Sequence, residues 1–253
     1  MDPAGRGRYG GLRGFRGFAA PLGLLMRTTP PPTATLPYVL EADGIQFAFG
    51  GRVLLADVYL RVQTGQVVGL LGRNGCGKST LLQTVAGGRR VADASVRLNG
   101  QRVVPAYRQP GLLNYLPQVP LLPAQLSVTA AARLLGVDAG AALAAFPELL
   151  AQAHRPVGEL SGGTTRLVEV LLLLHADTRF SLLDEPFIGV MPIHLETLVE
   201  VLRAVKPRKG ILLTDHRYEE VLALCDVVYL LHDGRLERLD DPRAGLLDRG
   251  YLR

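Results

Sequence analysis

The glycine-rich turn at residues 72–80 constrains the fold of this chain more than any other part of the sequence. It reads Gly-Arg-Asn-Gly-Cys-Gly-Lys-Ser-Thr, it follows the short apolar run Val67–Leu71, and it precedes a helix-like stretch at residues 80–86. Glycines let backbone N–H groups curl around a phosphate, and the positive end of the following helix dipole favours the same anion. We therefore expect a buried parallel strand, a phosphate-binding loop and a helix in succession.

Two side chains of this turn carry chemistry of their own. The Lys78 ammonium is expected to bridge the β- and γ-phosphate oxygens of a nucleotide, and the Ser79 hydroxyl is a ligand for Mg²⁺. The expected nucleotide-binding residues of the turn are Gly72, Asn74, Gly75, Cys76, Gly77, Lys78, Ser79 and Thr80.

Charge and cysteine content exclude several other classes of protein. The chain has 253 residues and a net charge of +5, but residues 1–36 carry +4 of it, which leaves +1 for the remainder. Because positive and negative charges are nearly equal after residue 36, the sequence does not indicate a nucleic-acid groove, and no nucleic-acid partner is expected. Two cysteines are too few for a disulfide framework or a four-ligand zinc site, as in a protein of a reducing compartment. The longest uncharged stretch, residues 109–132, contains four prolines and is not a membrane span.

Residues 1–36 form a leader rich in Gly, Arg and Pro, with little apolar periodicity. This composition predicts disorder. Three alternatives for this leader stay open: an RNA-binding arginine-glycine arm, a signal peptide, or an over-extended start with Met26 as the true initiator.

Short apolar runs alternate with helical patterns along the rest of the chain. This alternation predicts an α/β fold, in which helices cover a parallel sheet and an antiparallel flank lies early in the chain. The sequence Asn99-Gly100 predicts a hairpin turn in that flank. An Ala- and Leu-rich helical insertion is expected at about residues 119–158, within a domain that spans residues 37–240 and is followed by a tail at 241–253.

A second strand of the predicted sheet ends in two carboxylates. Phe180-Ser181-Leu182-Leu183 is apolar apart from one serine, and Asp184 and Glu185 follow it. Beside a phosphate loop, such an edge places Asp184 near the water shell of Mg²⁺ and Glu185 against the attacking water.

A third motif, Leu160-Ser161-Gly162-Gly163, stands between the phosphate loop and the Asp-Glu strand. With this order of motifs, residues 38–238 resemble the ATP-binding cassette (ABC) family of ATPases. The resemblance implies a P-loop NTPase fold with a RecA-like core. It also implies that Ser161, Gly162 and Gly163 face the γ-phosphate held by a second copy in a head-to-tail dimer.

Three further positions match the family pattern. Gln118 resembles the glutamine that senses Mg²⁺ and the γ-phosphate, and Phe49 resembles the aromatic residue that stacks on adenine. His216 resembles the switch histidine, which contacts the γ-phosphate. The resemblance therefore implies Glu185, His216, Lys78 and Gln118 as catalytic residues and Ser79, Gln118 and Asp184 as metal ligands.

Two positions depart from the family pattern. Thr164 stands where a glutamine is common, and Met191 stands where an aspartate commonly helps to couple the two sites of the dimer. The helical insertion is also shorter than is usual in transporter ATPases.

The sequences Asp184-Glu185-Pro186-Phe187 and Thr214-Asp215-His216 look most like those of lipopolysaccharide-export and branched-chain amino-acid-type ATPases, and like small stand-alone cassette proteins. The function implied is a Mg-ATP-hydrolysing homodimer that drives a separately encoded transmembrane permease from the cytoplasmic face of the membrane. Two alternatives stay open. One is a soluble cassette ATPase that serves an assembly machine of the iron-sulfur type, and the other is a nucleotide-gated regulatory module with weak turnover.

Overall fold

The computed structural model describes residues 37–89, 91, 93–103 and 105–252. The predictions for the leader at residues 1–36 lie outside the described residues.

The central sheet has six strands in the order β10-β9-β3-β8-β7-β6. The pairs β9–β3, β3–β8, β8–β7 and β7–β6 are parallel, and β10 pairs with β9 in the antiparallel sense. Every residue of β3, β7 and β8 is buried, as is typical of parallel strands covered on both faces. The strands are β3 (Val67–Leu71), β6 (Leu113–Leu116), β7 (Phe180–Asp184), β8 (Gly210–Thr214), β9 (Val227–His232) and β10 (Arg235–Leu239).

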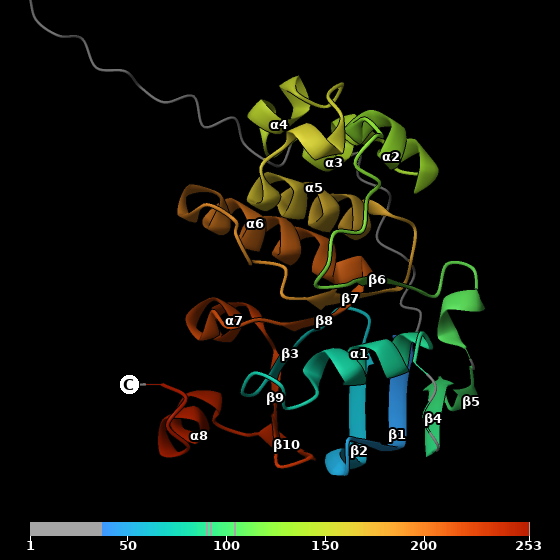
Figure 1. Ribbon diagram of the computed structural model, residues 1–253, viewed down its shortest axis with the longest axis vertical. Helices are drawn as coiled ribbons and strands as arrows, with labels where there is room; N and C mark the ends of the chain where they lie inside the picture. Colours follow the sequence, from blue (N-terminus) through green and yellow to red (C-terminus); the bar gives the residue numbers. More distant parts are fainter. Residues whose placement is uncertain (1–36, 90, 92, 104, 253) are drawn as a thin grey trace, which may run out of the picture. The chain divides into compact units, whose positions relative to one another are not determined.

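The two faces of this sheet support two separate hydrophobic cores. Val67 and Leu71 belong to one core, whereas Val68 and Leu70 on the same strand belong to the other. This is the alternation that a strand imposes on successive side chains. Figure 1 shows helices α5 and α6 on one face, and α1 with strands β1 and β2 on the other. The first core contains residues of the helices α5 (Gly162–His175), α6 (Pro192–Val205), α7 (Tyr218–Leu224) and α8 (Pro242–Asp248), together with residues of the helical insertion. Helix α1 (Lys78–Ala86) packs in the second core.

The antiparallel flank is a four-stranded sheet in the order β2-β1-β4-β5. Its strands are β1 (Val39–Phe49), β2 (Arg52–Gln63), β4 (Asp93–Leu98) and β5 (Gln101–Arg102). The expected hairpin turn joins β4 to β5, and Asn99 and Gly100 have φ angles of 48° and 80°. Positive φ at both central residues is the geometry that favours Asn-Gly in such turns.

The predicted helical insertion contains three short helices, α2 (Val128–Leu134), α3 (Ala139–Leu143) and α4 (Pro147–Ala151), followed by the 3-10 turn η3 (Val157–Glu159). The side chains of Ser127 and Asp138 accept hydrogen bonds from backbone N–H groups at the starts of α2 and α3. Figure 1 shows α2, α3 and α4 beyond α5, farther from the sheet. The remaining 3-10 turns are η2 (Ala106–Arg108) and η4 (Lys206–Arg208).

Three elements were not anticipated from the sequence: β6, β10 and α8. Strand β6 contains Asn114 and Tyr115 and lies near several prolines, so its apolar pattern is short. The side chain of Leu246 in α8 is fully buried in the core that also holds α5 and α6. The division of the chain at residue 240 stays a prediction.

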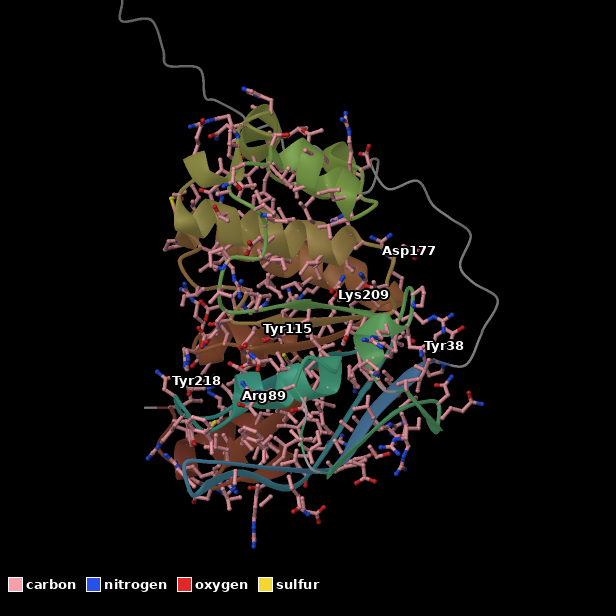
Figure 2. All side chains as sticks on the ribbon, turned by 45° about the vertical axis from the view of Figure 1, so that its right-hand side comes forward. Tyr38, Arg89, Tyr115, Asp177, Lys209 and Tyr218 are labelled. Carbon is pink, nitrogen blue, oxygen red and sulfur yellow. The ribbon has the colours of Figure 1, made fainter. Side chains whose placement is uncertain are left out.

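A buried lysine closes the end of helix α5. Lys209 is 2% exposed, and its ammonium donates hydrogen bonds to the carbonyls of Leu173 and Ala176 and to the hydroxyl of Thr178. Figure 2 shows Lys209 and Asp177 near each other at this end of the domain. Burial, assisted by the nearby Arg208, lowers the pKa of Lys209 to about 7.

This shift predicts a pH-dependent stability. Because Lys209 releases its proton near pH 7 when folded but near pH 10 when unfolded, the unfolded state binds more protons between these values. The free energy of unfolding should therefore rise with pH, by about 2 kcal/mol between pH 7 and pH 9, relative to a Lys209→Met variant.

Urea unfolding of both proteins across that pH range measures the difference. A Lys206→Met variant, which removes a half-buried lysine three residues away that pairs with Asp226, should retain the rise with pH. If the free energy of unfolding changed with pH in the same way for the wild type and Lys209→Met, the lowered pKa of Lys209 would be contradicted.

Candidate functional site

The phosphate loop has the backbone that its glycines require. Gly72, Gly75 and Gly77 have φ angles of 150°, 72° and 113°, and α1 begins directly after Gly77. A Cβ atom on Gly72 would lie 2.4 Å from the Leu231 carbonyl oxygen, so no other residue fits there without a backbone shift. The loop is therefore shaped by its glycines as the sequence predicted.

Lys78 is 7% exposed, and its ammonium folds back over this loop. It donates hydrogen bonds to the carbonyl oxygens of Gly72, at 2.8 Å, and Arg73, at 3.2 Å. Cys76 is half-buried inside the same loop, where burial raises the pKa of its thiol and Lys78 opposes that shift. The ammonium is thus held against the start of the glycine-rich loop, at the N-terminus of α1, where an anion would meet it.

Asp184, the last residue of β7, is almost fully buried. Its Oδ2 accepts a hydrogen bond from the Tyr115 hydroxyl at 3.3 Å, while its Oδ1 has no hydrogen-bond partner among the described residues. Burial raises the pKa of the Asp184 carboxyl, and the neighbouring Ser79 hydroxyl opposes the shift. Burial also raises the pKa of Tyr115 to about 12, so this phenol remains a hydrogen-bond donor.

This donor set fits a magnesium ion. A buried carboxylate oxygen without a partner lies near a hydroxyl, and carboxylate and hydroxyl oxygens are ligands that Mg²⁺ prefers. Among the described residues there is no cluster of three or more His, Cys, Asp or Glu that could hold a metal alone. Phosphate oxygens and water would therefore have to supply the remaining ligands, as is usual for Mg²⁺ at nucleotide sites.

The structure brings Gln118, Glu185 and His216 together from three separate loops. The amide Nε2 of Gln118 donates to Oε1 of Glu185 at 2.6 Å, and Nε2 of His216 lies 3.0 Å from the same oxygen. Glu185 is 6% exposed and has a positive φ of 56°, which is rare for a residue with a side chain. Its backbone N–H donates to the Thr214 carbonyl at 2.8 Å, which holds this backbone against the end of β8.

A buried arginine that the sequence interpretation missed organises these loops. Arg166 in α5 donates to the carbonyls of Asp184 and Glu185, and at 2.6 Å to that of Pro117, which precedes Gln118. One guanidinium therefore contacts both the carboxylate loop and the Gln118 loop. Burial lowers the pKa of Arg166, and Glu169 opposes that shift.

Glu169 completes this link one helical turn later. Its carboxylate lies 3.5 Å from the Arg166 guanidinium and accepts hydrogen bonds from the backbone N–H groups of Leu121 and Leu122. The available signal in the sequence was a pair of charged residues, three positions apart, in a helix whose middle is otherwise apolar. Such a pair has to be satisfied inside the protein when the helix is buried.

A second missed residue, Asp215, joins the Glu185 loop to the His216 loop. Its carboxylate accepts hydrogen bonds from the backbone N–H groups of Phe187, at 2.9 Å, and Arg217, at 3.0 Å. Burial raises the pKa of Asp215, and these hydrogen bonds oppose the shift. The position of His216 relative to Glu185 is thus fixed through the backbone on both sides.

The Ser161 turn begins α5, on the face of the sheet opposite α1 (Figure 1). The Ser161 hydroxyl accepts the N–H of Thr164 at 3.2 Å and lies 2.7 Å from the Thr164 hydroxyl. A Cβ on Gly163 would lie 1.8 Å from the carbonyl oxygen of Gly189, so only glycine allows this contact. Ser161 and Gly162 are exposed.

Phe49, the predicted adenine-stacking residue, is 73% exposed at the end of β1. It pairs with Arg52 across the β1–β2 hairpin, and Arg52 lies close enough to Cys76 to affect the pKa of that thiol. Leu54, two residues further along β2, lies against Gly77 of the phosphate loop. The hairpin therefore places an exposed aromatic ring beside the loop.

Comparisons with known proteins agree on one family. A family model described as "ABC transporter" matches residues 55–188. The lipopolysaccharide export system ATP-binding protein LptB of Acidithiobacillus ferridurans is 34% identical over 225 residues, which cover 81% of this chain and 93% of that protein. LptB of Escherichia coli K12 is 34% identical over 229 residues, covering 85% and 95%.

Solved structures show the same fold. The ATP-binding subunit of an ABC transporter superposes with a TM-score of 0.69 at 26% identity, over 84% of this chain and 95% of that one. A bacterial Atm1-family ABC exporter with ATP bound gives a TM-score of 0.73 at 21% identity, over 88% of this chain and 42% of that one.

The Arg166 contacts predict a large loss of stability on truncation. Arg166→Met leaves the buried Glu169 without its cation and removes one hydrogen-bond donor from each of three carbonyls, so we expect the free energy of unfolding to fall by about 3 kcal/mol. Denaturant unfolding measures this value. Arg133→Met, at an exposed arginine of α2, is the matched control and should change it by less than about 0.5 kcal/mol. Equal effects of the two substitutions would refute the structural role of Arg166.

Proposed function

Because the chain belongs to the ABC transporter family, it is an ATP-binding ATPase subunit of a transporter, and we propose that it hydrolyses Mg-ATP as a homodimer to drive a separate membrane protein. The family, the P-loop NTPase fold and the ATPase activity expected from the motifs are confirmed by the matches. We propose, in addition, that the protein binds Mg²⁺, forms a homodimer and acts on a membrane partner, and we assign roles to single residues of the site.

The cluster around Glu185 is the observation that carries the proposal. A nearly buried carboxylate, held by Gln118 and His216, lies one residue after Asp184 at the end of β7. A carboxylate in this position can orient a water molecule and accept its proton as the water attacks a phosphorus atom. We assign this role to Glu185.

Lys78, Ser79 and Asp184 make up the phosphate and metal side of the proposed site. Lys78 would exchange its two carbonyl partners for phosphate oxygens, and Ser79 and Asp184 would hold Mg²⁺. Bound Mg²⁺ neutralises charge that develops on the phosphate oxygens. Phosphoryl transfer depends mainly on such charge stabilisation and positioning, so these residues need no covalent role.

Gln118 and His216 position the reacting groups in this proposal. Both contact the same oxygen of Glu185, so the second carboxylate oxygen is left for the water. We propose that His216 also contacts the γ-phosphate and that Gln118 contributes to the metal site, as expected from the motifs. The adenine would stack on Phe49, whose ring is exposed beside the phosphate loop.

A second copy of the chain would complete each site. Ser161 and Gly162 are exposed at the N-terminus of a 14-residue helix, which is a ready-made anion site, and the phosphate loop lies on the other side of the sheet. A head-to-tail homodimer would bring the Ser161 turn of one copy to the γ-phosphate bound by the other.

We propose a separately encoded transmembrane protein as the second partner, reached from the cytoplasmic side. Within the part of the chain that the structure describes, no helix is long and apolar enough to cross a membrane. Val119 follows Gln118 directly and is 66% exposed, so a protein that docks there would be one residue from the reacting cluster. The relatives named for lipopolysaccharide export support an exporter, and a lipid-linked substrate is consistent with them.

Replacement of Glu185 by glutamine tests the assignment of the base. Glu185→Gln keeps the size and one acceptor oxygen for Gln118 but cannot take a proton, so we expect ATP hydrolysis to fall at least about 100-fold with ATP binding retained. Phosphate release and nucleotide binding are measured with purified protein and Mg-ATP. Glu196→Gln, at an exposed position of α6, is the control and should hydrolyse ATP like the wild type.

Undiminished hydrolysis by Glu185→Gln would show that Glu185 is not the base. Wild-type protein that binds ATP and dimerises without turnover would instead favour the nucleotide-gated module, the alternative that Thr164 and Met191 suggest. Met191 is 54% exposed and, at the start of α6, makes no side-chain capping hydrogen bond.

A further inference from the structure

A cavity of about 770 Å³ lies between the C-terminal end of α1, the β4–β5 hairpin and the turn η2. Its described lining includes Thr84, Arg102 and Ala106 but no residue of the phosphate loop, the Glu185 cluster or the Ser161 turn. The cavity is therefore separate from the proposed ATP site. Its volume is within the range that small-molecule sites occupy.

The described residues that line this cavity include four arginines and one carboxylate: Arg89, Arg97, Arg102, Arg108 and Asp43. Arg97 pairs with Asp43 at 3.4 Å. Among the described residues, Arg89, Arg102 and Arg108 have no carboxylate within ion-pair distance. Counting only the side chains that the structure describes, the cavity therefore carries about three positive charges without a carboxylate partner.

Neutral groups hold two of these arginines at the cavity. The Arg89 guanidinium donates to the side-chain oxygen of Gln83 at 2.9 Å and lies 5.1 Å from the centre of the Phe47 ring. The Arg108 guanidinium donates to the Tyr107 hydroxyl at 3.3 Å. Such contacts position a guanidinium while leaving its charge available for an anion.

General basicity of the protein does not account for this cluster. The chain after residue 36 carries a net charge of only +1. A second cavity, of about 780 Å³, has balanced charge: among the described residues that line it, the charged ones are Arg235 and Asp57. The excess positive charge is thus a local property of the first cavity, where concave walls of low dielectric focus it.

The floor of the cavity is fixed to helix α1. Gly87 caps α1 with a φ of 86°, and a Cβ on Gly87 would lie 2.7 Å from Cβ of Pro105 and 2.9 Å from the N atom of Ala106. This close approach holds η2 against the end of α1. Because α1 begins at Lys78, the cavity and the phosphate loop lie at opposite ends of one nine-residue helix.

The remaining walls indicate the kind of ligand. Val85, Val96 and Val103 supply apolar surface, and Tyr107 is 55% exposed at the rim. Planar guanidinium groups match phosphate oxygens in a two-pronged geometry, and apolar walls suit the organic part of the same molecule. We propose that this cavity binds a small phosphate-bearing ligand at a site distinct from the ATP site.

Titration with pyrophosphate tests the site. The protein is first saturated with Mg-ADP, so that the phosphate loop is occupied, and pyrophosphate is then added in a calorimeter. We expect the wild type to bind it and the double variant Arg102→Gln, Arg108→Gln to bind at least about tenfold more weakly, because two charge-assisted contacts are lost.

The matched control is Arg235→Gln at the second cavity, which should bind pyrophosphate like the wild type. Arg102 and Arg108 are exposed, so thermal melts of the double variant should match those of the wild type. Absence of binding to the wild type, or equal affinities of the wild type and the double variant, would overturn the proposal.

Vesicle flotation identifies the source of the phosphate group. If the ligand is a lipid headgroup, the wild type should float with phosphatidylglycerol vesicles but not with phosphatidylcholine vesicles, and the double variant should float with neither. If the ligand is a soluble phosphate ester, neither protein should float while the wild type still binds pyrophosphate. Equal flotation of both proteins with phosphatidylglycerol vesicles, together with equal pyrophosphate affinities, would exclude the arginine cavity.

Discussion

The hydrogen bonds of the Arg166 guanidinium are the interaction on which the geometry of the site depends. They join helix α5, which begins at the Ser161 turn, to the carbonyls of Asp184 and Glu185 and to the loop that carries Gln118. A buried guanidinium with fixed donors tolerates little displacement of these partners, because an unpaired buried charge is costly. The two loops therefore keep their relative positions only while α5 stays in place.

Local sequence was sufficient to predict the phosphate loop and most of the sheet. The turn at residues 72–80 forms because its glycines allow positive φ, and the buried runs of β3, β7 and β8 are continuous apolar segments. The meeting of Gln118, Glu185 and His216 was expected only through a resemblance, since it joins residues up to 98 positions apart. Spacing along the chain alone carries no such information.

Tertiary contacts account for what the sequence did not predict. Glu169 is an ordinary helical residue until its carboxylate meets the backbone N–H groups of Leu121 and Leu122. Tyr115 gains its significance from a single contact with Asp184, and β6, which contains it, is recognisable mainly by its pairing with β7. Roles of this kind depend on which elements become neighbours in the fold, which no window of the sequence encodes.

Mixing two inactive variants tests most directly whether each ATP site needs two copies of the chain. Lys78→Ala removes the phosphate-loop cation, and Ser161→Arg blocks the turn that would face the partner's nucleotide. Each variant alone should be inactive, but an equimolar mixture should recover about a quarter of wild-type ATPase activity, since half the dimers are mixed and each has one intact site. A mixture no more active than the separate variants would contradict the account.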